Sequence, residues 1–449
     1  MVRVHHLDTR VCDRVRVTST LDRRLGLTDA VVVGLGAMIG AGVFVAFAPA
    51  AARAGSLVWA ALAVAALVAV CNALSSSRLA ATFPAAGGTY VYGRELLGPL
   101  PGFLAGWGFV VGKTASCAAM ALTAGLYLWP ERAHEVAAVA VLALTALSVL
   151  GVQRTATASK VLVGIVLTVL AVYIVAAWAA PVAEPAAEMV PSGTVPAPGV
   201  DDEGWPERVL GVLGGAGFCF FAFAGYARIA TLGEEVRDPA RTIPRAVVVA
   251  IAVVIAVYAL VLAATVHVLG VAGVAAGEAP VLDAAERLWG GEFAPVVRVA
   301  AGIAALGALL AGVLGVSRTT MAMARDRHLP ASLAAVHPRS RTPYVAELCV
   351  GVFVAVVVLV ADLRQAIGFS SFAVLVYYLV ANASALRLER SRRRLPAWVP
   401  TLGAVGCVVV AGSLPWQSVL AGLAVFAVGG VVYAATRRRS VPPGVTSGA

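Results

Sequence analysis

The sequence predicts an all-α integral membrane protein with about twelve transmembrane helices. Of its 449 residues, 60% are hydrophobic and only 13% are charged, and the mean hydropathy is +0.89. A chain of this composition is not an ordinary soluble globular protein. Apolar runs of about 20 residues, which is the length that crosses roughly 30 Å of hydrocarbon, recur along it.

The apolar runs predict helices that are joined mostly by short loops. They cover residues 27–51, 56–80, 101–129, 135–152, 159–180, 207–231, 243–270, 293–322, 343–361, 365–386, 398–414 and 416–436. Segment 181–206 is rich in proline and acidic residues and lacks periodicity, which predicts an irregular external loop. We therefore expect one membrane domain over 25–436, with a tail at 1–24 and another at 437–449.

Positive charges are distributed unevenly between the two sides of these helices. With the N-terminus inside, about 26 of the 34 Lys and Arg residues lie in or beside internal segments, and six lie outside. This asymmetry predicts a plasma (inner) membrane protein whose two termini are both cytoplasmic. The formal net charge of +10 therefore needs no acidic partner, and no nucleic-acid motif accompanies it.

The reactive residues give no sign of a metal site or of catalysis. The cysteines are dispersed, at Cys12, Cys71, Cys117, Cys219, Cys349 and Cys407. No pair has metal-ligand or CxxC spacing, and no cluster of His, Asp or Cys lies at membrane depth. The sequence therefore predicts no cofactor and no metal, and it argues against a membrane enzyme.

The first apolar run carries glycines near its centre, at Gly34, Gly36, Gly40 and Gly42. Glycine costs roughly 0.8–1 kcal/mol relative to alanine inside a helix, so the cluster predicts a helix that opens. In hydrocarbon, an opened turn is tolerated where its N–H and C=O groups face protein, water or a ligand. The alternative is close helix packing, because GAMIG matches the GxxxG pattern.

The sixth apolar run is interrupted in a similar way. It reads GGAGFCFFAFAGYARIATLGEEVRDPARTIPRA from Gly214 to Ala246, and its break is expected at 221–225. Helices 1 and 6 begin two five-helix halves, at about 25–180 and 207–390, followed by two further helices at about 396–436. An odd number of helices gives the halves opposite orientations. Matched breaks in inverted halves indicate a binding site at the midplane.

Four motifs, in this order, resemble those of the amino acid–polyamine–organocation permeases, which have the leucine-transporter fold. They are GAMIGAGVF in helix 1, FPAAGGTYVYGRELLG (Phe83–Gly98), FFAFAGY followed by GEEVRDPARTIPRA, and MAMARDRHLPASLAAVHPRSRTP (Met321–Pro343). The resemblance covers about residues 20–436. It implies secondary active transport of amino acids by alternating access around the midplane site.

The resemblance implies that the two breaks hold the substrate, and the chemistry of the breaks agrees. N–H groups freed in helix 1 suit a carboxylate, and carbonyls freed in helix 6 suit an ammonium. The residues carried over as substrate-binding are Ile39, Gly40, Ala41, Gly42, Phe221, Ala222, Phe223 and Ala224. Phe221 matches the aromatic lid over the substrate; the alternative is a phenylalanine that faces lipid or core.

Selectivity and gating depend on the residues that follow the second break. Many relatives have a small or acidic residue after the aromatic, whereas here Ala227 is followed by Arg228. Arg228 either pairs with Glu235 or reaches the pocket, where it would disfavour cationic substrates. No acidic residue stands near either break, so we expect a small neutral or apolar amino acid. Phe221, Arg228 and Glu235 are the gate candidates.

The residues that bear on the coupling ion lie in helices 3, 5 and 8. The resemblance implies a shared sodium site with hydroxyls from helix 8, but 299–316 contains no Ser or Thr. Some proton-coupled relatives carry a lysine in helix 5, where this chain has Val166; Lys160 lies at the start of that helix. Lys113 in helix 3 is the candidate substitute, because a lysine buried in hydrocarbon can exchange protons. Alternatively, Lys113 is a fixed cation that carbonyls or a Glu satisfy.

Two charged internal loops, GEEVRDP and MARDRHLP, give a further gating hypothesis. Their mixed charges either form ion pairs that lock an inner gate or are ordinary solvated surface. The participants would be Glu234, Glu235, Arg237, Asp238, Arg325 and Asp326.

These observations favour an amino acid permease that works with protons or by exchange. Its expected partners are the amino acid substrate, protons and the lipid bilayer, with no nucleic acid. Amino acid export and a polyamine or cationic amino acid permease remain alternatives within the same class. A non-transporting membrane sensor would keep the same pocket, and the lack of an appended soluble domain argues against it.

Overall fold

The computed structural model describes residues 25–83, 87–150, 156–180, 204–230, 236–289, 292–338, 340 and 342–439. Within these residues the chain is helical and contains no strand, only an isolated bridge between Leu25 and Val236. Ten helical stretches are long and apolar enough to cross a membrane. Two shorter apolar helices, Tyr344–Val358 and Trp398–Gly412, lie where the ninth and eleventh spans are expected. The predicted all-α membrane fold is confirmed.

The helices follow the predicted order. The first half contains α1 (Leu27–Met38), α2 (Gly42–Val45), α3 (Phe47–Ala54), α4 (Val58–Thr82), α5 (Thr89–Leu97), α6 (Pro99–Leu128), α7 (Ala133–Val149) and α8 (Ala156–Ala179). The second half contains α9 (Trp205–Phe223), α10 (Ala227–Ala230), α11 (Pro239–Ala276), α12 (Pro280–Trp289), α13 (Ala294–Arg325), α14 (Tyr344–Val358) and α15 (Leu363–Arg387). The described part ends with α16 (Arg390–Arg393), α17 (Trp398–Gly412) and α18 (Trp416–Arg439).

The first span is interrupted where the glycines predict. α1 ends at Met38, and Ile39 leaves the helical region with φ −80° and ψ 62°. The helix resumes at Gly42 and continues from α2 into α3. Ala46, between them, has helical dihedral angles, and its N–H donates to Gly42 O. The span therefore consists of two helical halves with a short opened segment between them.

The sixth span is interrupted late in the expected window. α9 keeps its helical hydrogen bonds as far as Phe223, and Ala224–Tyr226 form a 3-10 turn, η5, before α10 begins. A 3-10 turn inside a helix often marks a functional or strained position. The prediction of interrupted helices 1 and 6 is confirmed.

Two short helices, α5 and α12, lie in segments that the sequence analysis treats as loops. α5 stands between Gly88 and Gly98, which have φ of 55° and 109°, so the chain turns sharply at both ends. α12 begins at Pro280, a favoured residue in a first helical turn. Both helices are amphipathic and short, and a search for apolar runs of about 20 residues does not find such segments.

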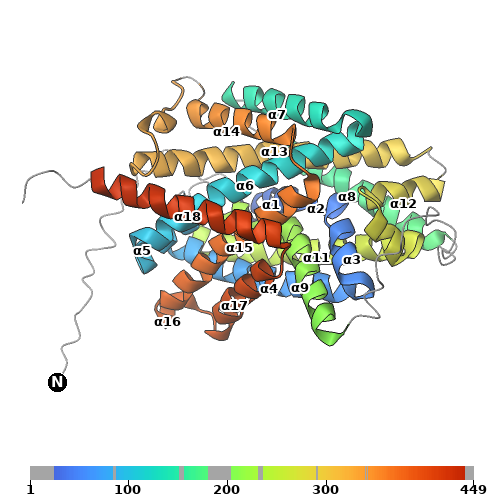
Figure 1. The fold of residues 1–449 in the computed structure, drawn as a ribbon, viewed down its shortest axis with the longest axis horizontal. Helices are drawn as coiled ribbons and strands as arrows, with labels where there is room; N and C mark the ends of the chain where they lie inside the picture. The colour runs from blue at the N-terminus through green and yellow to red at the C-terminus, as the bar shows by residue number, and fades with distance from the viewer. Residues whose placement is uncertain are drawn as a thin grey trace, which may run out of the picture.

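The arrangement of the helices buries the first interrupted span. Figure 1 shows α7 and α14 along the upper edge of the molecule, α13 next to them, and α6, α1 and α2 towards the middle. Large apolar side chains are exposed on α7, α8 and α18, among them Leu142, Val172, Val175, Val428 and Val431. Such surfaces suit contact with lipid.

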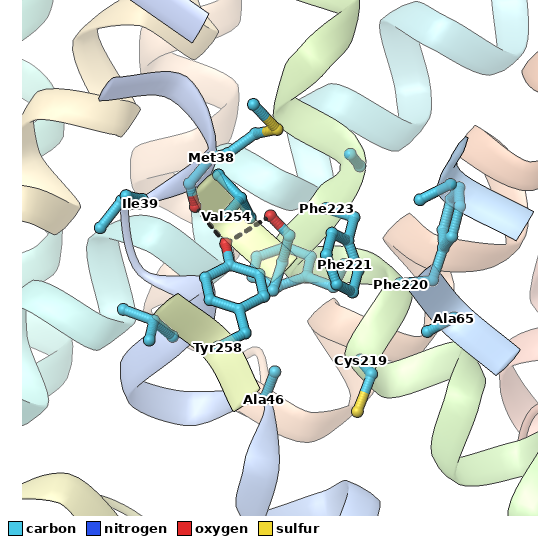
Figure 2. Packing of buried hydrophobic residues seen from close by; sticks show 14 of the residues in the cluster. Met38, Ile39, Ala46, Ala65, Cys219, Phe220, Phe221, Phe223, Val254 and Tyr258 are labelled. Carbon is cyan, nitrogen blue, oxygen red and sulfur yellow. Dashed lines mark hydrogen bonds between the residues drawn. The ribbon is translucent and has the colours of Figure 1, made fainter. Parts of the chain in front are cut away.

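The largest hydrophobic cluster surrounds the two breaks. Met38 and Ile39 from the first break lie in it with Phe221 and Phe223 from the second, and Tyr258 of α11 stands between them (Figure 2). The core of the fold and the breaks therefore coincide.

Candidate functional site

The two breaks touch each other through glycines. A Cβ on Gly42 would lie 2.4 Å from Ala222 Cα, and a Cβ on Gly225 would lie 2.2 Å from Ala37 O. Only a glycine fits at such distances, so each break supplies the glycine that lets the other approach. The structure therefore brings the two groups of sequence-predicted residues together.

Tyr258 joins the breaks by hydrogen bonds. Its hydroxyl oxygen lies 2.6 Å from Met38 O and 2.9 Å from Ala222 O (Figure 2). A phenol has a single proton to donate, so the two carbonyls share it. Tyr258 is not among the sequence-predicted site residues, because its side chain carries no charge that would stand out in an apolar span. A hydroxyl-bearing aromatic within the apolar run 243–270 was the available signal.

The first break leaves backbone donors open. Ile39 N–H donates to Leu35 O at 2.6 Å. In the described part of the chain, the N–H groups of Gly40, Ala41 and Gly42 have no hydrogen-bond acceptor. They lie at the start of the helix that runs from Gly42 through α3, where the helix dipole places partial positive charge. Open donors at this position suit an anionic group.

A cavity of about 80 Å³, which has room for several water molecules, reaches the second break. Its lining is Ala37, Gly87, Phe109, Lys113, Met120, Ala224, Gly225, Ala227, Arg228, Ala308, Ala311, Gly312, Gly315, Arg318 and Thr319. It runs from the middle of α6 to the turn before α5 and to the last turns of α13. These are the ends that the charge distribution predicts to be internal. We call it the inner cavity.

The inner cavity contains only part of the predicted site. Ala224 lines it, whereas the other residues expected to bind substrate are buried beside it around the breaks. Ala41, for example, packs with Ala124 and Ala305. Phe221 is 6% exposed within the main hydrophobic cluster, so it does not face lipid. Its role as a lid stays a prediction.

Lys113 projects from α6 to the second break. Its side chain is 9% exposed, and Nζ donates a hydrogen bond to Ala224 O at 3.1 Å. The hydroxyl of Tyr378, from α15, lies 3.4 Å from the same oxygen. Of the two partners expected for a fixed Lys113 cation, the structure shows a carbonyl.

Two further cations line the inner cavity, and no carboxylate does among the described residues. Arg228 and Arg318 belong to this lining. Arg228 therefore reaches the cavity, while its alternative partner, Glu235, lies outside the described residues. Glu347, which is fully buried and interacts with the charge of Arg318, is not part of the lining.

A second cavity lies on the other side of the breaks, and we call it the outer cavity. Its lining includes Val45 of α2 and Leu122 of α6, together with the polar residues His134, Glu278, Asp362 and Arg364. On α6, Met120 faces the inner cavity and Leu122 the outer one. The partition between the two cavities is therefore thin along α6.

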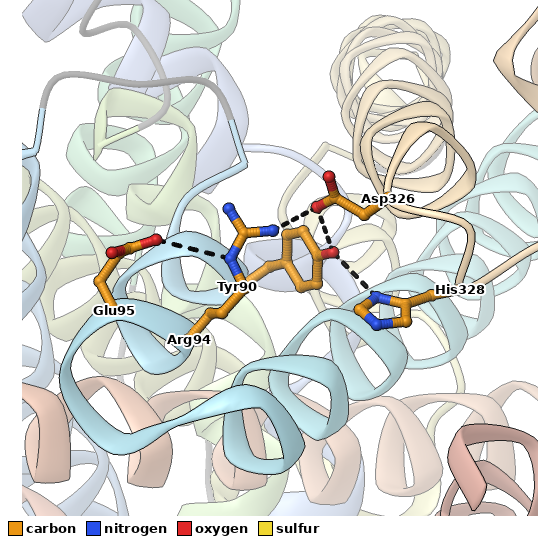
Figure 3. A network of polar contacts seen from close by, with 5 residues as sticks. All are labelled: Tyr90, Arg94, Glu95, Asp326 and His328. Carbon is orange, nitrogen blue, oxygen red and sulfur yellow. Dashed lines mark hydrogen bonds and ion pairs between the residues drawn. The ribbon is translucent and has the colours of Figure 1, made fainter. Parts of the chain in front are cut away.

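A polar network ties α5 to the end of α13. The hydroxyl of Tyr90 bonds to Asp326 Oδ2 at 2.5 Å and to His328 Nδ1 at 3.0 Å, and Arg94 Nη1 lies 2.5 Å from the same Asp326 oxygen (Figure 3). Burial, and then Asp326, raises the pKa of the Tyr90 phenol well above its ordinary value, so the phenol keeps its proton as a donor. Burial lowers the pKa of His328, and Asp326 partly opposes this.

This network bears on the expected gate residues. Asp326 pairs with Arg94, which the gating hypothesis did not include. Asp238 lies 3.8 Å from Arg241, and Arg237 N–H donates to Leu25 O. Arg325, at the end of α13, is exposed, and Glu234 and Glu235 are outside the described residues, so the ion-pair gate stays a prediction.

Helix 5 of the prediction corresponds to α8, and its lysine is held at the surface. Lys160 Nζ lies 2.7 Å from Asp29 Oδ1 in the first turn of α1. Val166, the position at which some relatives carry a lysine, is buried. This leaves Lys113 as the lysine nearest the breaks.

Comparison with known proteins agrees with this architecture. A family profile described as amino acid permease matches residues 29–444. The chain belongs to the amino acid permease family. It is a multi-pass membrane protein, and its family and relatives support amino acid transport as its activity.

Several relatives align over most of this permease. An uncharacterized transporter of Mycobacterium tuberculosis is 56% identical over 428 residues, which cover 95% of this chain and 94% of the relative. The branched-chain amino acid permease BcaP of Bacillus subtilis is 26% identical over an alignment that covers 94% of this chain and 95% of the relative. Cationic amino acid transporter 7, chloroplastic, of Arabidopsis thaliana is 30% identical over 83% of this chain and 67% of its own.

Proposed function

We propose that this permease is a secondary active transporter of small neutral or apolar amino acids. It works by alternating access across the plasma membrane, with both termini in the cytoplasm, and it is driven by protons or by exchange. The observation that carries the proposal is a cavity that ends at a broken helix and is lined by cations.

The two breaks offer complementary backbone groups to an amino acid. The open N–H groups of Gly40, Ala41 and Gly42 suit its carboxylate. The carbonyls of Ala222 and Ala224 suit its ammonium. Because Gly42 packs against Ala222, the donors and the acceptors lie within the span of one α-amino acid.

The charge of the inner cavity supports a neutral substrate. Lys113, Arg228 and Arg318 line it without a carboxylate among the described lining residues. Two like charges 4 Å apart repel by about 4 kcal/mol at an effective dielectric constant near 20. A lysine-like side chain or a polyamine brings such a charge into the cavity, whereas a small apolar side chain does not.

The two cavities support alternating access. They approach the breaks from opposite sides, and neighbouring turns of α6 separate them. A modest rearrangement around the breaks would therefore close one route and open the other, which is how inverted-repeat transporters work.

The direct test is thermal stabilisation of the purified chain by each common amino acid and by several polyamines. A ligand at one hundred times its Kd adds about 2.7 kcal/mol of stability. We expect stabilisation by small neutral or apolar amino acids. Stabilisation confined to cationic amino acids or polyamines would contradict the substrate class.

Counterflow in proteoliposomes then separates a transporter from a sensor. Vesicles loaded with unlabelled substrate should accumulate labelled substrate from outside. Binding without counterflow would favour the sensor.

A further inference from the structure

Lys113 occupies the backbone group that the amine of the substrate needs. Its Nζ lies 3.1 Å from Ala224 O at the break after α9. Ala224 lines the inner cavity, and Ala222, whose carbonyl bonds Tyr258, does not. A lysine ammonium and an α-ammonium are the same kind of donor, a compact cation with three N–H groups. Lys113 is therefore placed as a tethered equivalent of the substrate amine.

The surroundings of Lys113 make a second ammonium at this oxygen unfavourable. Lys113 forms no ion pair within the described residues. The titratable or charged groups that face it or share its cavity are Cys117 on α6, Arg228 on α10, Arg318 on α13 and Tyr378 on α15. Arg228 and Arg318 have interactions of their own, so the positive charge at Ala224 O itself is that of Lys113. Like charges a few ångströms apart repel each other, and they do so more strongly in a partly buried site than in bulk water.

We propose that the amine of the substrate and the proton on Lys113 compete for Ala224 O, so that this permease exchanges an amino acid for a proton. The inference rests on the proposed function. On binding, the Lys113 ammonium gives one proton to water in the cavity, and the neutral amine moves off Ala224 O. The ammonium of the substrate takes its place. On release, Lys113 takes a proton back from water and returns to the carbonyl.

Mutually exclusive binding has a quantitative signature. Wherever Lys113 is protonated in the empty permease, each molecule of substrate that binds releases one proton. By linkage, the Kd for the amino acid then falls tenfold for each unit of pH increase. If Lys113 simply swings aside with its proton, no proton is released and the Kd does not follow pH.

The experiment uses the full-length permease in detergent and the neutral amino acid that stabilises it most. Calorimetric titrations from pH 6 to pH 8.5, in two buffers of different ionisation enthalpy, give the Kd and the number of protons released. For the native chain we expect about one proton per substrate and the tenfold slope over the part of this pH range in which Lys113 is protonated in the empty permease. For Lys113→Met we expect a Kd that does not depend on pH, no proton release, and at least tenfold tighter binding than the native chain at pH 6.

The chain offers a matched control, because Lys160 is its other lysine. Lys160→Met removes the same charge at the surface and should keep the native slope and proton release. Lys113→Arg keeps a cation that does not lose its proton, so it should bind substrate at least tenfold more weakly at pH 8 without proton release. The 2-hydroxy acid with the same side chain lacks the ammonium and should bind the native chain without proton release.

The possible failures are distinct. Amino acid binding to the native chain with a flat pH profile, or proton release that persists in Lys113→Met, overturns the competition and leaves the proposed function standing. No amino acid binding to the native chain or to Lys113→Met at any pH overturns the proposed function, and the competition with it. If Lys113→Met does not fold, the proton count of the native chain and the Lys113→Arg variant decide the question.

Discussion

The two helix breaks differ in how their freed backbone groups are used. At the first break, the N–H groups of Gly40, Ala41 and Gly42 have no acceptor within the described residues. At the second, the carbonyl of Ala222 accepts from Tyr258, and that of Ala224 accepts from Lys113. The donors are left open while the acceptors are already engaged. A carboxylate would meet a prepared site, whereas an amine would have to displace donors that the protein supplies.

The second halves of the two helices also have different covers. α2 packs against α9 and α6 and also against α12, the short helix that carries Asp283. α10 packs against α1, α4 and α11. The chain that enters α1 is joined to the chain that leaves α10, because Arg237 N–H donates to Leu25 O at 2.9 Å. A short helix, α12, therefore forms part of the cover of the first break, whereas spanning helices cover the second.

The largest effect should come from filling the contact between the breaks. Gly42→Val and Gly225→Val each place a side chain within 2.4 Å of the opposite backbone. Overpacking of this kind costs about 1–3 kcal/mol or more, so we expect both variants to lower Tm and to abolish counterflow. Gly164→Ala, at a helical glycine with open space around it, is the control and should keep native Tm. Native transport by either valine variant would show that the two breaks do not approach as closely as described.

Removing the hydroxyl that joins the breaks should come next. Tyr258→Phe leaves the carbonyls of Met38 and Ala222 without that donor, and an unsatisfied buried acceptor costs about 1–3 kcal/mol. We expect a larger drop in Tm than for Tyr378→Phe, whose hydroxyl lies farther from the break carbonyl that it contacts, 3.4 Å from Ala224 O. Equal drops for the two variants would mean that Tyr258 does not serve both breaks.

The cover of the first break should respond to pH. Burial, followed by the charges of Glu286 and Glu278, raises the pKa of Asp283 from 3.8 to about 6. The folded protein then binds this proton more tightly than the unfolded chain, so stability falls as pH rises through about 6. After a discount for its partial exposure, we expect Asp283→Asn to gain about 1 kcal/mol at pH 7.5.

The measurement for Asp283 is Tm against pH, from pH 4 to pH 8. The gain of Asp283→Asn should shrink towards pH 4, where the native carboxyl is protonated. Glu131→Gln changes the net charge equally at an exposed position and should show no such trend. A difference in Tm between the variant and the native chain that stays constant from pH 4 to pH 8 would show that the ionisation of Asp283 does not affect stability.

The smallest effect should come from the ion pair at the start of α1. Lys160 lies 2.7 Å from Asp29, with side chains 46% and 22% exposed. Exposed pairs of this kind contribute about 0.2–1 kcal/mol, so Lys160→Met should lower Tm only slightly, and less so at high salt. A loss of counterflow in this variant would mean that the first half of the helix is positioned by this pair and not by the contact between the breaks.

The sequence predicts the fold well because its strongest signals are local. Apolar length locates the spans, and the glycines around Gly40 locate the first break, since both signals act within a single helix. The short helices α5 and α12 cannot be predicted in this way, because their amphipathic pattern covers only two or three turns. They are held instead by contacts such as that between Tyr90 and Asp326, whose partners are 236 positions apart.

The candidate site was predictable only in part for a similar reason. The breaks could be located, but the side chains that engage them come from other helices. No sequence feature near Ala224 indicates that its carbonyl accepts a hydrogen bond from Lys113, which lies 111 positions earlier. Lys113 itself could be identified as a candidate from the sequence, because a charge in an apolar run is costly. Tyr258 and Tyr378 carry no such charge, and only the tertiary structure shows that their hydroxyls contact the carbonyls at the breaks.

The bond between Met38 and Tyr258 also sets an order of assembly. Its partners are 220 positions apart, which corresponds to about 10–40 s of synthesis at about 5–20 residues per second. During that interval the α11 hydroxyl and the α9 surface that complete the first break have not been made. An unsatisfied turn is poorly tolerated in hydrocarbon. We therefore expect the first helix of this permease to take its final, opened conformation only after the seventh helix has been synthesised.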